Sequence, residues 1–152
     1  MILRIIIFLV INFAALGIGS YFTGSGVSSE WYQTLNKAPW TPPGWFFGVA
    51  WTTIMICFSI YLAYLWPLAD NTQKLILLFS IQWVLNVSWN PAFFYFRNVG
   101  SGLVIISLLT ALIGYFIFLY SSELKAKSLL LAPYFIWLVI ATSLNAYVLI
   151  KN

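Results

Sequence analysis

Five long runs of apolar residues constrain the fold of this chain more than any other feature of its sequence. We place them at about residues 2–23, 44–66, 73–94, 98–120 and 128–149. Each run is close to the roughly 20 residues that an α-helix needs to cross the hydrocarbon core of a bilayer. Every charged residue lies outside these runs or in the first turn of one. The pattern predicts an all-α integral membrane protein, a bundle of five transmembrane helices that forms a single domain over residues 1–152.

The composition agrees with a membrane protein. Hydrophobic residues make up 62% of the chain and charged residues 7%, whereas soluble domains average about 45–50% and 25%. Only helices and closed barrels satisfy the backbone hydrogen bonds within lipid. Continuous apolar stretches such as 75–79 and 103–109 lack the alternation of a barrel strand, so helices are predicted. The first run exceeds the roughly 7–15 apolar residues of a signal peptide, and we expect a retained helix.

Residue types that carry common chemistry are scarce. The chain has no histidine, and Cys57 is its single cysteine, which excludes histidine-based triads, thiolate metal clusters and intrachain disulfides. We therefore predict no metal site and no cofactor. The seven basic residues are scattered singly and form no stripe that could follow phosphates, so we expect no nucleic-acid partner.

The connection at residues 24–43 is much longer than the other three connections. It is rich in aromatic residues and proline, and its prolines favour extended or turn structure over a continuous helix. Loops of this length are often functional lids. Trp and Tyr side chains also anchor proteins at the level of the lipid headgroups. The sequence leaves the lid and the anchor equally open.

Polar side chains inside apolar runs are costly in lipid and usually face protein or a cavity. In the third and fifth runs they recur with indoles at helical spacing: Gln82, Asn86, Trp89 and Asn90 in one, and Trp137, Ala141 and Asn145 in the other. We predict that these groups and Trp51 converge on one interior cavity, aromatic with a few hydrogen-bonding groups, as small-molecule pockets usually are. The alternative is that the amides are hydrogen-bonded contacts between helices.

The fourth run carries a strip of small residues without aromatic side chains: Ser107, Thr110, Ala111 and Gly114. Their i, i+3, i+4, i+7 spacing suits close helix packing, either within one monomer or across a dimer.

Three segments carry a family resemblance. They are Trp31-Tyr32-x-x-Leu35-x-Lys37-x-Pro39-Trp40-x-Pro42-Pro43-x-Trp45-x-Phe47 with Trp51-Thr52, then Leu85-Asn86-x-x-Trp89-x-Pro91-x-Phe93-Phe94, then Leu130-x-x-Pro133-Tyr134-x-x-Trp137-x-x-x-Ala141-x-x-Leu144-Asn145. In this order and spacing, over about residues 31–145, they resemble the signature of the translocator protein family, also called tryptophan-rich sensory proteins or peripheral benzodiazepine receptors. The chain departs from the family at Val49-Ala50, where Pro-Val is frequent, and at Asn90, where Ser is common; both departures leave ligand preference open.

The resemblance implies a five-helix bundle, often a homodimer, with a pocket that the first long loop closes, and for a bacterial-type member it implies the cell membrane. The implied ligands are porphyrins such as protoporphyrin IX, sterols, and benzodiazepine-type synthetic compounds. The implied pocket residues are Tyr32, Pro42, Trp51, Asn86, Trp89, Trp137 and Ala141. Some bacterial members are reported to degrade protoporphyrin photochemically, and the tryptophans implicated there correspond to Trp51 and Trp137, which are catalytic residues only if this chain has that activity.

Our leading hypothesis is a membrane receptor for porphyrins, because indole and phenol rings can stack on a flat aromatic ligand. The lack of histidine makes a metal-free porphyrin a better match than haem. A light-driven porphyrin oxidase is the first alternative. A passive porphyrin or sterol transporter is the second, since the runs lack coupling carboxylates and the chain lacks a nucleotide-binding loop.

Membrane lipid, including sterol, is the other expected partner. The segment Leu144-x-x-Tyr147-x-x-x-Lys151 fits a proposed cholesterol pattern. The ordinary end of a membrane helix, with an anchoring Tyr and a Lys that reaches the interface, explains this segment better.

Overall fold

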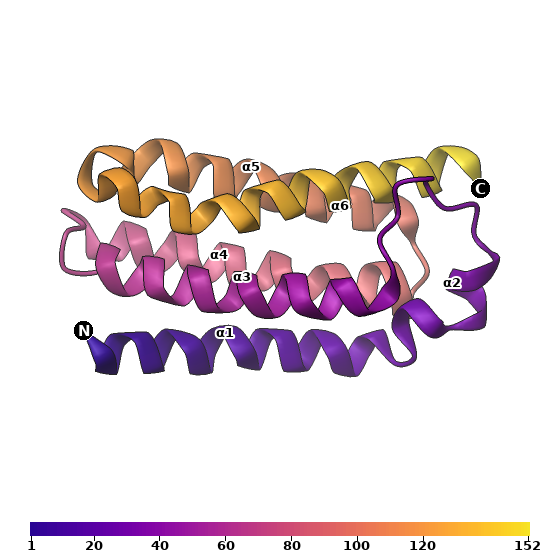
Figure 1. The fold of residues 1–152 in the computed structure, drawn as a ribbon, viewed down its shortest axis with the longest axis horizontal. Coiled ribbons are helices and arrows are strands. Elements are labelled where there is room, and N and C mark those ends of the chain that lie inside the picture. Colours follow the sequence, from indigo (N-terminus) through magenta and orange to yellow (C-terminus); the bar gives the residue numbers. More distant parts are fainter.

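The computed structural model describes all 152 residues and contains five long helices. They are α1 (Ile2–Thr23), α3 (Gly44–Leu65), α4 (Thr72–Asn90), α5 (Val99–Leu124) and α6 (Ala132–Lys151). Consecutive helices run antiparallel along one long axis (Figure 1). Four continuous helical segments are long and apolar enough to cross a membrane, and the last of them, Val99–Lys151, contains both α5 and α6. The predicted all-α bundle of five helices is therefore confirmed.

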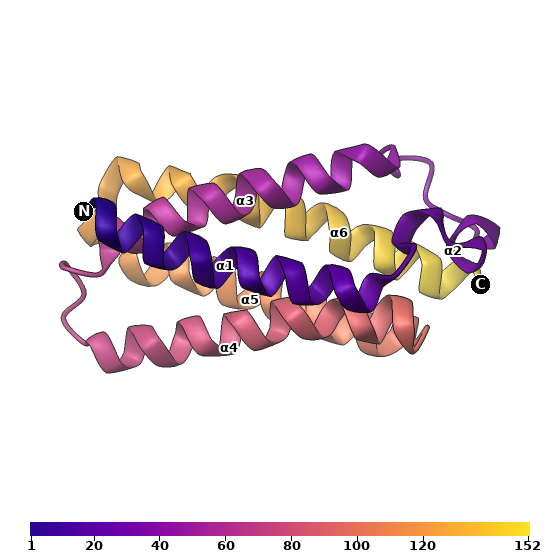
Figure 2. The same ribbon diagram turned by 90° about the horizontal axis from the view of Figure 1, so that it is seen from below.

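The five helices form a ring in the order α1, α3, α6, α5, α4. α1 contacts both α3 and α4, α5 contacts both α4 and α6, and α3 closes the ring against α6. Figure 2 shows α1 in front of this arrangement, with α3 and α4 on opposite sides of it. The centre is filled by aromatic side chains that are almost fully buried, among them Phe58, Tyr61, Phe116 and Tyr134. This packing occupies the half of the bundle that lies away from the long loop.

Several helix ends differ from the sequence prediction. α4 stops at Asn90, and the chain continues through a π-helical turn (Pro91–Tyr95) because Pro91 has no N–H to continue the α-helical pattern. α5 extends to Leu124 rather than to residue 120. The expected connection at 121–127 is consequently mostly helical, since a 3-10 helix (Lys125–Leu131) leads directly into α6. Pro133 falls in the first turn of α6, where its missing N–H leaves no bond unmade.

Side-chain caps explain where two of the long helices begin. The Oδ1 atom of Asn71 accepts a hydrogen bond from the backbone N–H of Lys74 at the start of α4. Asn98 does the same for Ser101 at the start of α5. Both asparagines satisfy an N–H group that the helix itself leaves free.

The predicted loop at 24–43 contains two short helical pieces, a 3-10 turn (Gly26–Ser28) and α2 (Glu30–Thr34). Gly24 and Gly26 have φ angles of 57° and 51°, a conformation that glycine adopts without strain. The loop then runs without regular structure into α3. It caps the end of the bundle where α1 ends and α6 ends (Figure 1).

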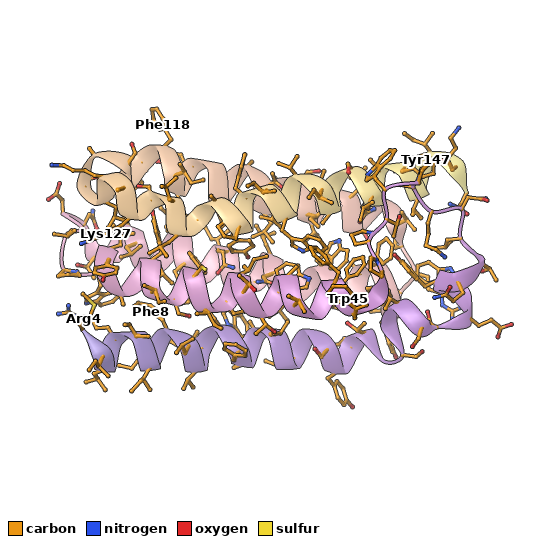
Figure 3. The ribbon with its side chains drawn as sticks, viewed as in Figure 1. Arg4, Phe8, Trp45, Phe118, Lys127 and Tyr147 are labelled. Carbon is orange, nitrogen blue, oxygen red and sulfur yellow. The ribbon has the colours of Figure 1, made fainter.

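Charged and apolar side chains are distributed as a bilayer requires. Arg4 and Lys127 lie at one end of the bundle, and Trp45 and Tyr147 lie toward the other, loop-bearing end (Figure 3). Phe118 projects outward from α5 and is 80% exposed, as expected for a side chain that faces lipid. The distribution supports an orientation with the helix axes across the membrane.

The small-residue strip of α5 is used partly within the monomer. Thr110 Oγ1 lies 3.1 Å from Thr142 Oγ1 of α6. A Cβ atom added to Gly114 would lie 3.2 Å from the ring of Phe135, also on α6. These two positions allow α5 and α6 to approach closely, whereas Ser107 and Ala111 remain exposed on the outside.

Candidate functional site

The largest hollows associated with the predicted site residues lie at the loop-bearing end of the bundle. One has a volume of about 360 Å³ and is bounded by α1, the start of the long loop, α3 and α4; we call it the helix cavity. Its wall includes Trp51 of α3 and Asn86, Trp89 and Asn90 of α4. Ser20 of α1 and Gly48 of α3 also border it and are exposed, so the cavity reaches the bundle surface between α1 and α3.

Two further hollows lie under the long loop. The loop cavity has a volume of about 370 Å³ and is bounded by Tyr32, Lys37, Pro42 and other loop residues together with the start of α3. The small cavity, about 30 Å³, lies deeper and touches Tyr32, Trp89, Ala141 and Asn145. The helix cavity and the loop cavity each fall within the roughly 300–1,000 Å³ of typical small-molecule sites.

Phe47 is the side chain that these hollows share. It borders the helix cavity, the loop cavity and the small cavity. Its ring packs edge-on against Trp137, with the ring centroids 5.3 Å apart. Phe47 stands one helical turn before Trp51, so both project from the same face of α3. A change in the position of this one ring would alter the passage between the hollows.

Three polar side chains form a buried cluster beside the helix cavity. The hydroxyl oxygen of Tyr134 accepts hydrogen bonds from Gln82 Nε2 at 2.6 Å and from Asn86 Nδ2 at 3.1 Å. Gln82 Oε1 has no hydrogen-bond partner. Asn86 borders the helix cavity, but Gln82 borders neither that cavity nor the loop cavity nor the small cavity. Gln82 thus acts as a contact between α4 and α6, the alternative that the sequence had left open.

The other two amides are also held by neighbouring helices. Asn90 Oδ1 accepts a hydrogen bond from Thr23 Oγ1 of α1 at 2.9 Å. A Cβ atom on Gly19 would lie 2.6 Å from Asn90 Nδ2, so a side chain at this position would displace the Asn90 amide. Asn145 joins three helices, because its Oδ1 accepts from Trp89 Nε1 at 3.2 Å and its Nδ2 donates to the backbone oxygen of Val99 at 2.8 Å.

The π-helical turn after α4 builds an aromatic wall. Trp89 stacks on Phe93 with the ring centroids 5.3 Å apart and the planes 20° from parallel. Phe94 approaches Trp89 edge-on, and Tyr32 of α2 packs against both phenylalanines. The turn therefore aims two consecutive phenylalanines at the loop, a use of irregular helix that is frequent at functional sites.

Trp137 lies apart from the other predicted site residues. It borders a groove of about 240 Å³ between α3 and α6, which we call the outer groove. Val49 and Ile136 in the same groove are 52% and 58% exposed, so the groove faces the surroundings of the bundle. The indole itself is 4% exposed, and its Nε1 has no hydrogen-bond partner. Its link to the three inner hollows is its contact with Phe47.

The long loop is tied to the end of α6. Trp40 Nε1 donates a hydrogen bond to Ser143 Oγ at 3.1 Å, and the Trp40 ring packs against Tyr147 at 5.5 Å. Asn36 and Asn152 are joined by hydrogen bonds that involve both side chains and backbone. These contacts hold the loop across the ends of the inner hollows, which is the arrangement expected of a lid.

The structure divides the single cavity expected from the sequence. Trp51, Asn86, Trp89 and Asn90 meet at the helix cavity; Tyr32, Trp89, Ala141 and Asn145 at the small cavity; and Tyr32 and Pro42 at the loop cavity. Gln82 and Trp137 lie outside these three. Sequence reasoning did not select Phe47 or Lys37 as site residues. Phe47 could have been predicted from the sequence, because it lies four positions before Trp51 and so on the same face of the predicted helix.

Lys37 is the one charged side chain that borders the three inner hollows, and the other groups in their walls are neutral. No group of three or more His, Cys, Asp or Glu side chains lies together in a way that could hold a metal ion. Burial raises the pKa of the Tyr32 phenol above its ordinary value of 10.0, so this hydroxyl stays neutral at physiological pH. The arrangement can therefore hold a flat, largely apolar ligand by stacking, dispersion and a few hydrogen bonds.

Comparison with known proteins agrees with this architecture. The TspO/MBR family model matches residues 6–150. A tryptophan-rich protein TspO from Archaeoglobus fulgidus is 38% identical over 88% of this chain and 87% of its own length. The translocator protein of Homo sapiens is 31% identical over 84% of this chain and 78% of its own. Protein CrtK of Rhodobacter capsulatus is 33% identical over 76% and 74%. The chain belongs to the TspO/MBR family and is a multi-pass integral membrane protein.

Proposed function

We propose that this protein is a membrane receptor that binds porphyrins such as protoporphyrin IX beneath its long loop. The observation that carries the proposal is the pair of cavities of about 360 and 370 Å³ that meet at Phe47. Trp51, Trp89 and Phe94 supply aromatic surface on which a flat macrocycle can stack. The opening between α1 and α3 gives a ligand dissolved in the bilayer lateral access to the helix cavity.

Saturable quenching of tryptophan fluorescence on titration with protoporphyrin IX tests the proposal. We expect Trp51→Phe to weaken binding by roughly 2- to 10-fold, the effect of one lost aromatic stacking contact. Trp66→Phe is the matched control, because Trp66 lies at the opposite end of α3 and packs against Phe8. Quenching that does not saturate in the wild-type protein, or equal losses in both variants, would reject a porphyrin site at the helix cavity.

A second candidate function is light-driven oxidation of the bound porphyrin, with Trp51 and Trp137 as electron-transfer partners. The observation that favours it is the contact of Trp137 with Phe47, a ring that borders the helix cavity together with Trp51. Illumination of the complex in air, with absorption spectra recorded against free porphyrin, separates catalysis from binding. A spectrum that changes no faster than that of the free dye rejects the enzyme and leaves the receptor.

Sterols are a weaker proposal for the same chain. Two residues of the proposed cholesterol pattern, Leu144 and Tyr147, have other surroundings. Leu144 borders the small cavity of about 30 Å³, which is too small for a sterol, and the ring of Tyr147 packs against Trp40. Passive movement of porphyrin across the bilayer remains compatible with an opening between α1 and α3. Flux of protoporphyrin IX into liposomes, with and without the protein, distinguishes movement from binding alone.

A further inference from the structure

Lys37 is the only charged side chain that borders any of the four cavities described here. It touches both the loop cavity and the small cavity. The helix cavity and the outer groove have no charged residue in their walls. Lys37 is half-buried, so its charge lies partly within the loop cavity rather than wholly in solvent.

The ammonium group of Lys37 is held in place without being neutralised. Its Nζ donates hydrogen bonds to the backbone oxygens of Tyr32 at 3.0 Å and Gln33 at 3.1 Å, at the end of α2. It also lies 5.0 Å from the centroid of the Tyr32 ring. An ammonium group has three N–H donors, so one donor remains free after these two bonds.

None of the three acidic residues of the chain is a partner of Lys37. Glu30 lies in the first turn of α2, Asp70 lies in the connection between α3 and α4, and Glu123 accepts a hydrogen bond from Ser122 near the end of α5. The last two are at the opposite end of the bundle from the loop. The site therefore offers one fixed, half-buried cation with a free donor and no acidic side chain bonded to it.

We infer that Lys37 selects ligands that carry a carboxylate, so that the loop cavity receives the charged edge of the ligand. The inference rests on the proposed function. A carboxylate would accept the free N–H of Lys37 as a charge-assisted hydrogen bond, which is stronger than a neutral one. The apolar body of the ligand would extend past Phe47 into the helix cavity, whose polar wall groups are all neutral.

The loop cavity is the more polar of the two cavities and the helix cavity the more aromatic. The loop cavity has Gln33 and Thr41 beside Lys37, so water and polar atoms are accommodated there. The helix cavity presents the rings of Trp51, Trp89 and Phe94. A flat molecule with carboxylates at one edge, such as a dicarboxylic porphyrin, matches this polarity from end to end.

Protoporphyrin IX and its dimethyl ester test the inference, because the ester keeps the macrocycle and removes both negative charges. Both ligands are titrated into the full chain in an uncharged detergent, where no lipid phosphate competes for Lys37. We expect Lys37→Met to weaken binding of the acid by about tenfold, which corresponds to about 1.4 kcal/mol. We expect binding of the ester to stay unchanged, and Lys37→Arg to restore most of the affinity for the acid.

Lys151→Met is the matched control, since it removes the same charge at the same end of the bundle from a residue that borders none of these cavities. Equal losses for acid and ester in Lys37→Met would mean that Lys37 only shapes the loop, and would overturn the inference. Unchanged binding of the acid would overturn it as well. If either of these two results is obtained and the ester still binds saturably, the proposed porphyrin receptor is retained and only the contact between Lys37 and a carboxylate is rejected. If neither ligand binds the wild-type protein, the proposed function itself fails.

Discussion

Asn36 in the long loop and Asn152 beyond α6 hold one another across 116 positions of the sequence. Asn152 Oδ1 accepts the backbone N–H of Asn36 at 2.9 Å and lies 3.3 Å from its Nδ2, while Asn152 Nδ2 donates to the backbone oxygen of Asn36 at 3.3 Å. These bonds are exposed, so each contributes only about 0.5–1.5 kcal/mol. An exposed set of weak bonds is suited to a lid that opens and closes.

Removing the Asn152 side chain should loosen the loop without unfolding the bundle. We expect Asn152→Ala to speed amide hydrogen exchange at residues 35–41 by roughly 3- to 10-fold, the effect of one or two lost hydrogen bonds. Exchange within α3 and α5 should not change. Asn152→Asp keeps an oxygen for the Asn36 N–H and should have an intermediate effect. Equal exchange in all three proteins would show that the loop is held by Trp40 and its neighbours instead.

Filling the helix cavity from Gly48 should block the ligand while leaving the fold intact. A Cβ atom at Gly48 meets nothing within 4 Å, and the residue borders the cavity. We expect Gly48→Leu to abolish saturable binding of protoporphyrin IX. The same change should raise the melting temperature slightly, because glycine inside a helix costs about 0.5–1 kcal/mol relative to alanine.

Gly17→Leu provides the control for that experiment. Gly17 lies on the exposed side of α1, has equal room for a Cβ atom, and borders none of the cavities described here. It should gain similar helix stability and keep full porphyrin binding. Binding that persists in Gly48→Leu would place the ligand elsewhere.

Tyr134→Phe should destabilise the centre of the bundle more than the same change at Tyr61. Loss of the Tyr134 hydroxyl leaves the N–H groups of Gln82 and Asn86 without their acceptor. A buried unsatisfied donor costs about 1–3 kcal/mol, and bonds between membrane helices average nearer 0.6 kcal/mol. Tyr61 makes only one long bond, 3.4 Å to the backbone oxygen of Phe116, so its loss should be smaller. Denaturant titration in mixed micelles measures both, and equal losses would contradict the role assigned to the Tyr134 cluster.

The number and approximate limits of the long helices could be predicted from the sequence because bilayer thickness fixes the length of an apolar run. The burial of Gln82 and Asn86 could be predicted for a related reason, since an amide in lipid needs a protein partner. Their i, i+4 spacing then placed both on one face of α4. Both side chains indeed reach the same atom, the Tyr134 hydroxyl oxygen.

The division of the site could not be predicted, because it depends on angles that accumulate along a helix. Residues eight positions apart differ by about 80° around the axis of an α-helix. Trp137 and Asn145 therefore face different neighbours: Trp137 lies against Phe46 and Phe47 of α3, whereas Asn145 lies against Trp89 and Val99. The same rotation of about 80° separates Gln82 from Asn90 on α4, and Asn90 accordingly bonds to Thr23 of α1. The order of the helices around the ring, which no local sequence pattern encodes, then determines which neighbouring helix each side chain meets.

Replacing Phe47 by alanine should join the hollows that its ring separates. The change removes the side chain common to the helix cavity, the loop cavity and the small cavity. We expect association of protoporphyrin IX with Phe47→Ala to be several-fold faster, because the ring no longer narrows the passage between loop and helices. The melting temperature should fall, since the contact with Trp137 at 5.3 Å is lost.

Phe46→Ala is the control, because that ring also contacts Trp137, at 5.7 Å, but borders the outer groove instead. Stopped-flow fluorescence gives the rates, and equal rates in the two variants would show that Phe47 fills space without governing access.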